Sequence, residues 1–477
     1  MKGTNNIKNI MAVIAVFLTI SIGAAVFAVA RPANAPAVDE NPDGSYTQNE
    51  EPQQTEQPAP TDDGTQPDEN GENPTETPQP TPTAKPTATP EQTATPAPTA
   101  TPTVQPTPTP QKLPKSDRLR AMWISYLEFQ SVDFSSKSAF VSQMDTMFAN
   151  CADLGLNTVI VQVRPFGDAL YKSSVYPTSH LINGTQGAEL AFDPLAEMVT
   201  LAHNRGLRIE AWVNPYRAKL NAKNPSSFAA NNPANNAEWV FNVDGGVYYN
   251  PCLEQVQDLV VRGIEEIVRG YDVDGIHLDD YFYPSTDMSL DASHYAASGS
   301  GLSQAEWRRE NVNTLIRKIY QKIKSIDSSV TFGISPQGNN DNNYNVQYSD
   351  VRLWLREEGY VDYIMPQLYW GFGYLTKSGR TDYQFANLVE QWAGYPRHSS
   401  VKLNIGLGAY RIGAGDGGAN DQSEWSSGYN LMKQINTLTA NGNVSGFALY
   451  RYDNLFKNTQ YAELAKSERE HIKDILS

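Results

Sequence analysis

From Arg118 onward the chain alternates short apolar segments with amphipathic segments eight times, and this alternation constrains the fold more than any other feature. Short apolar runs predict buried strands, and the longer amphipathic runs predict helices. Strict alternation predicts parallel strands joined by right-handed crossovers. No glycine-rich nucleotide-binding motif follows any of the strands. Eight repeats therefore favour closure into a (β/α)8 barrel of the TIM type, rather than an open sheet.

The expected strands are separated by segments that carry helix-capping signals. Asp193 before Pro194 predicts the start of one helix, and Ser303 with Glu306 predicts a capping box at another. The repeat region has about 350 residues, against ~250 in a typical barrel, and the excess lies in loops after the third and fourth strands. The expected strands are residues 120–126, 158–163, 208–216, 275–284, 330–336, 363–370, 403–410 and 446–452.

The fourth expected strand changes from apolar to acidic at its C-terminal end, where Asp279 and Asp280 stand side by side. Barrel enzymes place their catalytic groups at this end of the strands. Because side chains alternate along a strand, His277 and Asp279 are expected to face the barrel axis. Asp280 then lies at the rim or braces a neighbouring loop. The alternative is that the pair caps the next helix or forms a salt bridge with an arginine.

Every expected strand ends in polar or aromatic side chains, although its interior is apolar. In a barrel these side chains converge on one rim, where aromatic rings can stack on sugar C–H faces while amides and carboxylates bind hydroxyls. For each residue alone, packing at the rim or bracing of a loop is as good an explanation as a role in binding. The evidence for a binding site is that all of these side chains converge on one rim. The candidate binding residues are Arg164, Asp168, Asn214, Tyr216, His277, Tyr281, Gln367, Tyr369, Trp370, Tyr410 and Tyr450.

The first 115 residues differ in composition from the rest. Lys2 and Lys8 precede an uncharged run at residues 10–30 that predicts an export signal, or a membrane tether if it stays uncleaved. Residues 31–115 are rich in Pro, Thr, Gln and Glu and predict a disordered, extended linker. We therefore expect a signal peptide or signal anchor at 1–30, a linker at 31–115 and a barrel at 116–477, located outside the cell or at its surface.

Charge and cysteine content narrow the classes of partner. The formal net charge is −16, and no basic stripe interrupts the folded part, which argues against nucleic acid and anionic membrane surfaces as partners. The six histidines and two cysteines show no metal-ligand spacing, so no metal or cofactor is expected. Cys151 lies in an apolar helical run, which favours a buried free thiol, although one bridge to Cys252 stays open. We expect a monomer.

Four sequence runs resemble the glycosyl-hydrolase-like family 10 domain of bacterial exported proteins. They contain the motifs QVRP, WVNPY, DDY and MPQLYW, within residues 161–171, 211–217, 274–283 and 365–370. The resemblance implies a (β/α)8 barrel that hydrolyses glycosidic bonds in bacterial wall or surface polysaccharide, with peptidoglycan glycan strands favoured. It also implies site roles for Arg164, Asn214 with Tyr216, and the segment from Asp279 to Tyr281. Residues 176–180 depart from the family's Pro-Trp-Ser pattern.

Glycoside hydrolysis uses two carboxyl groups, one protonated as an acid and one ionised. Asp279 is the first candidate and Asp280 its close competitor. Because neighbours on a strand face apart, the second carboxylate is expected from another strand end: Asp168, Asp453, Glu128 or Glu210. Two alternatives stay open, a barrel that binds glycan without turnover, and a metal-dependent hydrolase or deacetylase. The second alternative needs His and Asp ligands that the sequence does not bring together.

Overall fold

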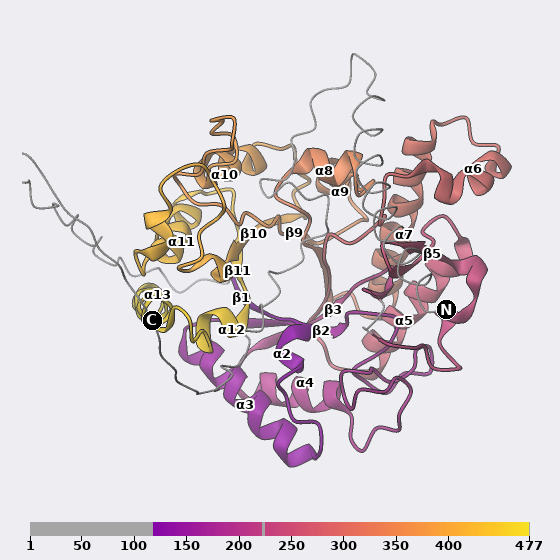
Figure 1. Ribbon diagram of the computed structural model, residues 1–477, viewed down its shortest axis with the longest axis horizontal. Coiled ribbons are helices and arrows are strands. Elements are labelled where there is room, and N and C mark those ends of the chain that lie inside the picture. Colours follow the sequence, from indigo (N-terminus) through magenta and orange to yellow (C-terminus); the bar gives the residue numbers. More distant parts are fainter. Residues whose placement is uncertain (1–117, 222–224, 477) are drawn as a thin grey trace, which may run out of the picture. The chain divides into compact units, whose positions relative to one another are not determined.

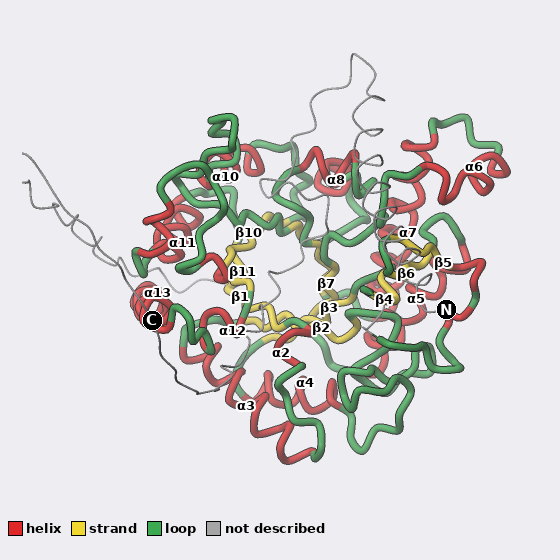
Figure 2. The backbone as a smooth tube through the Cα atoms, viewed as in Figure 1, coloured by secondary structure: helices red, strands yellow, loops and turns green. Residues whose placement is uncertain are grey.

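A computed structural model describes residues 118–221 and 225–476 of the chain. Eight parallel strands close into a barrel, with helices packed around the outside (Figures 1 and 2). The predicted (β/α)8 barrel is therefore confirmed. In barrel order the strands are β1 (Leu119–Ile124), β11 (Gly446–Tyr450), β10 (Lys402–Gly408), β9 (Tyr363–Ile364), β8 (Thr331–Ile334), β7 (Gly275–Leu278), β3 (Arg208–Val213) and β2 (Thr158–Arg164).

The helices begin where the capping signals predicted. Asp193 accepts a hydrogen bond from Ala196 N at the start of α4, and Ser303 with Glu306 forms the capping box of α7. The helices are α2 (Tyr126–Phe129), α3 (Lys137–Asp153), α4 (Pro194–Asn204), α5 (Glu254–Gly270), α6 (Ala292–Ser298), α7 (Gln304–Ile326), α8 (Asn340–Asn345), α9 (Val351–Arg356), α10 (Phe385–Ala393), α11 (Asn430–Ala440), α12 (Tyr452–Phe456) and α13 (Ala462–Leu476), with 3-10 turns η1 (Pro233–Asn235), η2 (Ala237–Trp239), η3 (Met288–Asp291), η4 (Ala409–Arg411) and η5 (Gln422–Ser426).

Two separate apolar layers follow from the alternation of side chains along the strands. Ile276 and Leu278 pack into the large outer layer between strands and helices. Trp123 and Trp212 belong to a smaller cluster inside the barrel. His277 contacts both of these indole rings, so it faces the axis as the sequence predicted. The barrel interior is thus a packed core, and in barrels of this type the active site lies at the C-terminal ends of the strands.

Some expected strands end earlier than predicted. β3 stops at Val213 and β9 has only two residues, whereas the expected strands ran to residues 216 and 370. A proline follows shortly after each strand, at Pro215 and Pro366, and proline has no N–H to donate to a ladder. At β1 the chain turns into α2 at Tyr126, which was expected to continue the strand. Residues beyond the last hydrogen bond between neighbouring strands are still buried. The apolar pattern of the sequence alone therefore overestimates the length of the strands.

The long segment after β3 was expected to be a loop, but it contains a small antiparallel sheet. Its strands are β4 (Arg217–Lys219), β6 (Gly246–Tyr249) and β5 (Val240–Val243), in that order. Asp244 and Gly245 connect β5 to β6 with positive φ angles of 50° and 81°. Both central residues of a type I′ hairpin turn need positive φ, and Asp-Gly supplies them at low cost. The sheet brings Arg217 to the barrel rim.

The predicted signal segment (1–30) and linker (31–115) lie outside the described residues. Within the described ranges, none of the helices combines the length and the apolar character that crossing a membrane requires. Both cysteines are free thiols, and Cys151 is buried as predicted.

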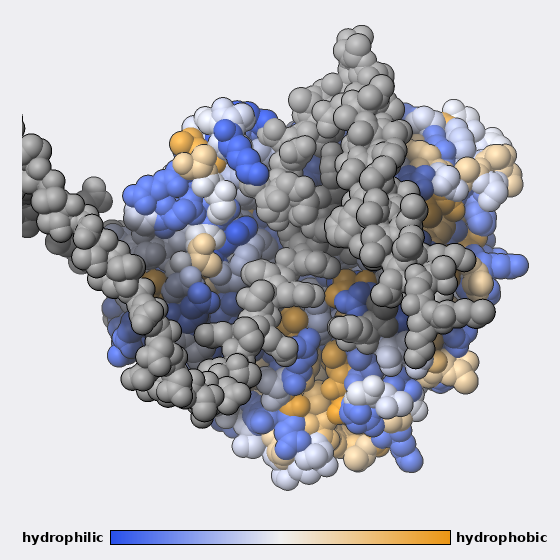
Figure 3. Space-filling view, viewed as in Figure 1, coloured by the Kyte–Doolittle hydropathy of each residue, from blue (hydrophilic) through white to orange (hydrophobic). Residues whose placement is uncertain are grey.

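The visible surface near α10 and α11 is mostly hydrophilic (Figure 3).

Candidate active site

Asp279 lies just past the C-terminal end of β7 and is held by side chains from the neighbouring strand β3. Its Oδ2 accepts one hydrogen bond from Trp212 Nε1 at 3.1 Å and another from Asn214 Nδ2 at 2.7 Å. Its Oδ1 accepts a longer bond of 3.3 Å from the backbone N–H of Tyr281. Only 3% of the residue is exposed. The carboxyl group is therefore fixed through one oxygen, and the other oxygen is less engaged.

Asp280 points the other way, towards the strands that follow β7. Its Oδ1 accepts a hydrogen bond of 3.1 Å from Gln367 Nε2, just past β9. Gln367 also forms isolated bridges to Gln337 and Gly406, so it connects β10 with the segments that follow β8 and β9. Asp280 thus braces neighbouring segments, one of the two placements that alternation predicted for it.

Burial and mutual repulsion favour the protonated form of this acid pair. Burial, and secondly the charge of Asp280, raise the pKa of Asp279 to about 7, against the opposing charge of Arg217. Burial also raises the pKa of Asp280, although hydrogen bonds from Gln337 and Gln367 oppose the shift. Two carboxylates so close together do not both ionise readily. A carboxyl group that keeps its proton near neutrality can act as a general acid.

Arg217, the first residue of β4, was not among the predicted site residues. Its Nε donates to Pro165 O at 3.1 Å, and its guanidinium carbon lies 4.8 Å from the centre of the Tyr281 ring. The rings of Tyr126 and Phe166 also face it, at 5.7 and 5.1 Å. Its charge lowers the pKa of both Asp279 and Asp280, although burial is the larger influence on each. Arg217 could have been identified from the sequence, because it is the last residue of the run at 211–217 that contains the WVNPY motif.

A chain of hydrogen bonds runs below Asp279 through the barrel interior. Trp123 Nε1 lies 3.2 Å from His277 Nε2, and His277 Nδ1 lies 2.8 Å from Tyr363 Oη. Because an indole only donates, His277 Nε2 must accept, and its proton is on Nδ1. Tyr363 then donates to Glu210 Oε2 at 2.5 Å. Burial lowers the pKa of His277 to about 3, so the ring is neutral and supports Asp279 from below.

Three predicted aromatic residues form one cluster at the ends of β9, β10 and β11. The rings of Tyr369 and Tyr450 stack 5.7 Å apart, and Tyr410 meets Tyr369 edge-on at 5.5 Å. Tyr450 also contacts Trp123 at 5.9 Å, which joins this cluster to His277. Trp370 lies further out, against Tyr374 and Tyr383. Ring contacts through Trp123 and His277 therefore connect this cluster to Trp212, which donates a hydrogen bond to Asp279.

Three other predicted binding residues lie away from this set. Arg164 is buried, with its guanidinium carbon 4.5 Å from the Tyr176 ring. Tyr216 is fully buried in the outer layer. Asp168 accepts hydrogen bonds from His180 Nδ1 at 2.7 Å and Gln186 Nε2 at 2.9 Å, which brace the loop after β2. These contacts give all three a packing role, and their binding roles stay predictions.

The candidates for a second carboxylate have structural partners of their own. Glu128 Oε1 accepts from Arg451 at 2.7 Å and from Asp453 N at 3.1 Å. Asp453 pairs with Lys457 at 3.2 Å. Glu210 bonds to Tyr363, below His277 in the barrel interior. Asp280 differs from these three acids, because its side-chain hydrogen bond comes from the amide of Gln367.

In the described ranges, three or more His, Cys, Asp or Glu side chains nowhere gather as a metal site would require.

The sequence of the chain is similar to that of proteins from one family. The family model described as glycosyl hydrolase-like 10 matches residues 118–427. Glycosyl hydrolase YngK of Bacillus subtilis is 34% identical over 371 residues, which cover 72% of this chain and 70% of that protein. Glycosyl hydrolase DigH of Escherichia coli K12 is 34% identical over 339 residues, covering 65% and 75%. The chain belongs to the glycosyl hydrolase-like 10 family, and the enzyme class implied by the sequence resemblance, hydrolysis of glycosidic bonds, is confirmed.

Among solved structures, the glycoside hydrolase domain of PgaB (BpsB) from Bordetella bronchiseptica matches with a TM-score of 0.49 at 12% identity. The match covers 74% of this chain and 99% of that domain.

Proposed function

We propose that this member of the family cleaves glycosidic bonds in bacterial wall or surface polysaccharide, with peptidoglycan glycan strands favoured, and that Asp279 is its general acid. One observation carries the catalytic assignment. Asp279 stands at the C-terminal end of a barrel strand with Oδ2 held by Trp212 and Asn214, and its pKa is raised to about 7. The proton then resides on Oδ1, the oxygen with the weaker contact.

In this mechanism Asp279 donates its Oδ1 proton to the glycosidic oxygen as the bond from that oxygen to the anomeric carbon breaks. A water molecule from solvent then bonds to the anomeric carbon through its oxygen and returns one proton to Asp279. The transition state has oxocarbenium character, so a nearby negative charge stabilises it. We assign this charge to Asp280, because two adjacent carboxyl groups do not both ionise readily and Asp279 holds the proton in this mechanism. Burial raises the pKa of Asp280, and the hydrogen bonds from Gln337 and Gln367 oppose this shift and favour the ionised form. The pair therefore divides into one acid and one carboxylate.

The aromatic cluster of Tyr369, Tyr410 and Tyr450 provides rings on which the C–H faces of a sugar can stack. Asn214 and Gln367 carry amides beside the acid pair. Arg217 adds a cation held between aromatic rings. Such a mixture suits a neutral, hydroxyl-rich polymer better than a nucleic acid. It supports a polysaccharide substrate.

The predicted export signal at 1–30 and the linker at 31–115 support an extracellular substrate. A proline-rich linker extends by about 3.1 Å per residue, which lets a tethered barrel reach material far from the membrane. Wall polysaccharide fits that location. Cell fractionation tests this part: full-length chain found in the cytoplasm, with residues 1–30 intact, would contradict it.

The catalytic proposal is tested with purified protein and purified bacterial sacculi, by measuring release of reducing ends. Asp279→Asn is expected to lower the rate about 10²- to 10⁴-fold, the range typical of general acid catalysis. Asp280→Asn is expected to lower it roughly 10- to 100-fold, because it removes a charge near the transition state. Asp258→Asn, at an exposed position on α5, is the matched control and keeps the wild-type rate.

Wild-type rates in both Asp279→Asn and Asp280→Asn would overturn the catalytic assignment. Tight binding of glycan by the wild-type protein with no product after prolonged incubation would instead establish a binding barrel without turnover. Activity on other bacterial surface polysaccharides, but not on sacculi, would keep the acid pair and reject peptidoglycan as the substrate.

A further inference from the structure

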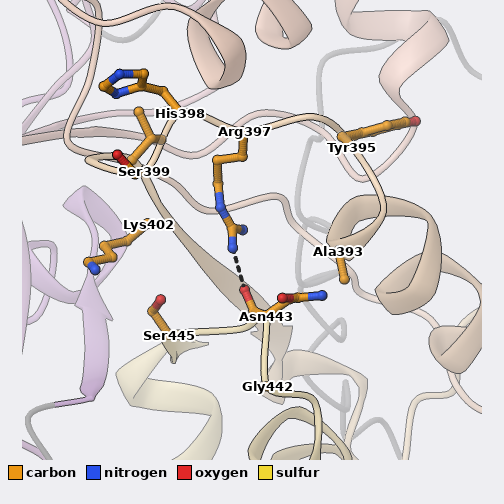
Figure 4. Close-up of a pocket in the computed structure, with 10 residues that line it drawn as sticks. Ala393, Tyr395, Arg397, His398, Ser399, Lys402, Gly442, Asn443 and Ser445 are labelled. Atoms are coloured by element: carbon orange, nitrogen blue, oxygen red, sulfur yellow. Dashed lines mark hydrogen bonds between the residues drawn. The ribbon is translucent and has the colours of Figure 1, made fainter.

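A cavity lies at the end of the barrel opposite to Asp279. It is formed where the loop from α10 to β10 meets the loop from α11 to β11 (Figure 4). Lys402 is the first residue of β10, and Ser445 immediately precedes β11, so the cavity lies at the N-terminal ends of these strands. We call it the basal cavity. The residues used below are Tyr395, Arg397, Ser399, Lys402, Asn443 and Ser445.

The basal cavity is large enough for a small organic ligand. Its volume is about 410 Å³, inside the range of roughly 300–1,000 Å³ found for small-molecule sites. A water molecule occupies about 30 Å³ of liquid, so a single inorganic anion would leave most of this space empty. A ligand that filled this space would be larger than a single inorganic anion.

The lining of the cavity is positive, in a chain whose net charge is −16. Arg397 and Lys402 contribute to the wall, whereas Asp and Glu are absent from the lining residues that the structure describes. The nearby acid Asp362 accepts a backbone bond from Lys402 N, but its carboxylate is paired with Lys324 at 2.7 Å. The cations of the cavity are therefore not neutralised by that carboxylate.

Arg397 is positioned without an acidic partner. One guanidinium nitrogen, Nη2, donates to the backbone oxygen of Asn443 at 2.9 Å, and this bond links the two loops (Figure 4). Burial lowers the pKa of Arg397, because the side chain is half-buried. Within residues 118–221 and 225–476, the side chains of Arg397 and Lys402 form no ion pair that would offset this cost. A guanidinium fork held this way matches the geometry of a phosphate or carboxylate group.

The remaining wall residues carry hydroxyl and amide groups. Ser399 and Ser445 flank the space between Arg397 and Lys402 in Figure 4. Tyr395 and Asn443 lie at its edge. Hydroxyls and amides both donate and accept, so they suit a ligand body rich in hydroxyl groups.

We propose that the basal cavity binds a saccharide-sized ligand that bears a phosphate or carboxylate group, with Arg397 and Lys402 as its cationic contacts. The site is independent of Asp279 and goes beyond the proposed hydrolysis. It gives the barrel a second point of attachment to an anionic glycan, at the face that the catalytic rim does not use.

Calorimetric titration of the full chain with glucose 6-phosphate, glucuronate, inorganic phosphate and glucose tests this proposal. Glucose 6-phosphate or glucuronate is expected to bind at least about ten-fold more tightly than neutral glucose, and which of the two binds more tightly identifies the charged group. Lys402→Gln is expected to weaken that binding on the order of ten-fold, the cost of a charged hydrogen bond. Lys402 is exposed, so this variant keeps the fold.

Three controls make the result specific. Lys377→Gln removes an exposed lysine elsewhere and leaves binding unchanged. Asp279→Asn also leaves binding unchanged, which separates the two sites. Arg397→Lys keeps the charge but loses the fork, and it weakens binding. Equal binding of glucose and glucose 6-phosphate would overturn the proposal. So would wild-type binding in both Lys402→Gln and Arg397→Lys, or loss of binding in Asp279→Asn.

Discussion

The indole N–H of Trp212 donates to the same oxygen of Asp279, Oδ2, that accepts the side-chain amide of Asn214. The strand register explains this arrangement, because Trp212 pairs with His277 across β3 and β7. Two residues further along each chain segment, past the ends of both strands, Asp279 lies beside Asn214. A carboxyl oxygen with two donors is a poor place for a proton, so the acidic hydrogen is directed to Oδ1. The pairing of these strands thus sets which oxygen of Asp279 meets the substrate.

The pH dependence of hydrolysis follows from the raised pKa of Asp279. A general acid must be protonated, so activity is expected below about pH 7 and to fall as the pH rises through that value. The measurement is kcat/KM for release of reducing ends between pH 4 and 9. An alkaline limb near the ordinary pKa of aspartate, instead of near 7, would show that burial and Asp280 do not hold the proton.

Trp212→Phe is expected to move this alkaline limb to higher pH. The hydrogen bond from Trp212 stabilises the ionised carboxylate and so lowers the pKa of Asp279. We expect the loss of this hydrogen bond to move the alkaline limb by roughly one pH unit, since a change of about 1.4 kcal/mol in the stability of the carboxylate shifts its pKa by one unit. Trp239→Phe, at a half-buried tryptophan in η2, is the matched control and leaves the limb in place. A shift to lower pH, or an equal shift in both variants, would contradict the role given to Trp212.

The repeating pattern of the sequence was enough to predict the barrel, but not its insertion. Each apolar run forms a strand because its side chains are buried on both faces, between the barrel interior and the surrounding helices. The small sheet after β3 went unpredicted, although Asp244 and Gly245 are a strong hairpin signal between apolar residues. Arg217 enters the rim on this sheet. Its approach to Tyr281 depends on packing between distant segments, which a local pattern does not encode.

Alternation predicted the faces of His277 and Asp279 because β7 is regular. It did not settle Arg164, since the pairing of β2 with β3 shifts register between Gln162 and Arg164. Such a bulge changes which face the following side chain takes. Arg164 accordingly contacts Tyr176 in the outer region. The alternation of side chains predicts which face each one takes only where the pairing of the strands is regular. The sequence gives no sign of the bulge between Gln162 and Arg164.

Gly333→Ala is expected to destabilise the barrel from within. Gly333 pairs with His277 across β8 and β7, and a Cβ at this position would lie 1.9 Å from Cζ of Tyr363. The tyrosine ring must then move away from His277 and Glu210. We expect a loss of about 1–3 kcal/mol in the free energy of unfolding, the usual cost of overpacking a core. Denaturant unfolding at pH 6 measures it.

Gly270→Ala is the control for this variant, because a Cβ there meets no atom within 4 Å. Its free energy of unfolding is expected to stay within about 0.5 kcal/mol of wild type. Equal stability of Gly333→Ala and wild type would show that the Tyr363 ring has room to shift, and that the interior hydrogen-bond chain is less tightly packed than described.

Glu468 on α13 makes the stability of the barrel depend on pH. Its carboxylate accepts from the backbone N–H groups of Asn430, at 2.6 Å, and Leu431, at the start of α11, where Tyr429 offers no side-chain cap. Burial outweighs these bonds and raises its pKa to about 7, from an ordinary value near 4.5. The folded state therefore binds the proton more tightly than the unfolded chain. This contribution to stability is complete below pH 4.5 and is lost as the pH rises through 7.

Glu468→Gln is expected to remove this dependence, because glutamine keeps an acceptor for the amides and does not ionise. The difference in free energy of unfolding between the variant and wild type should change by roughly 3 kcal/mol between pH 4.5 and pH 8, in favour of the variant at high pH. Taking the difference cancels the other buried acids, Asp279, Asp280 and Glu210. Glu463→Gln, exposed on the same helix, is the matched control and gives a flat difference. A flat difference for Glu468→Gln as well would mean that the carboxylate caps α11 fully ionised, with the amide bonds outweighing burial.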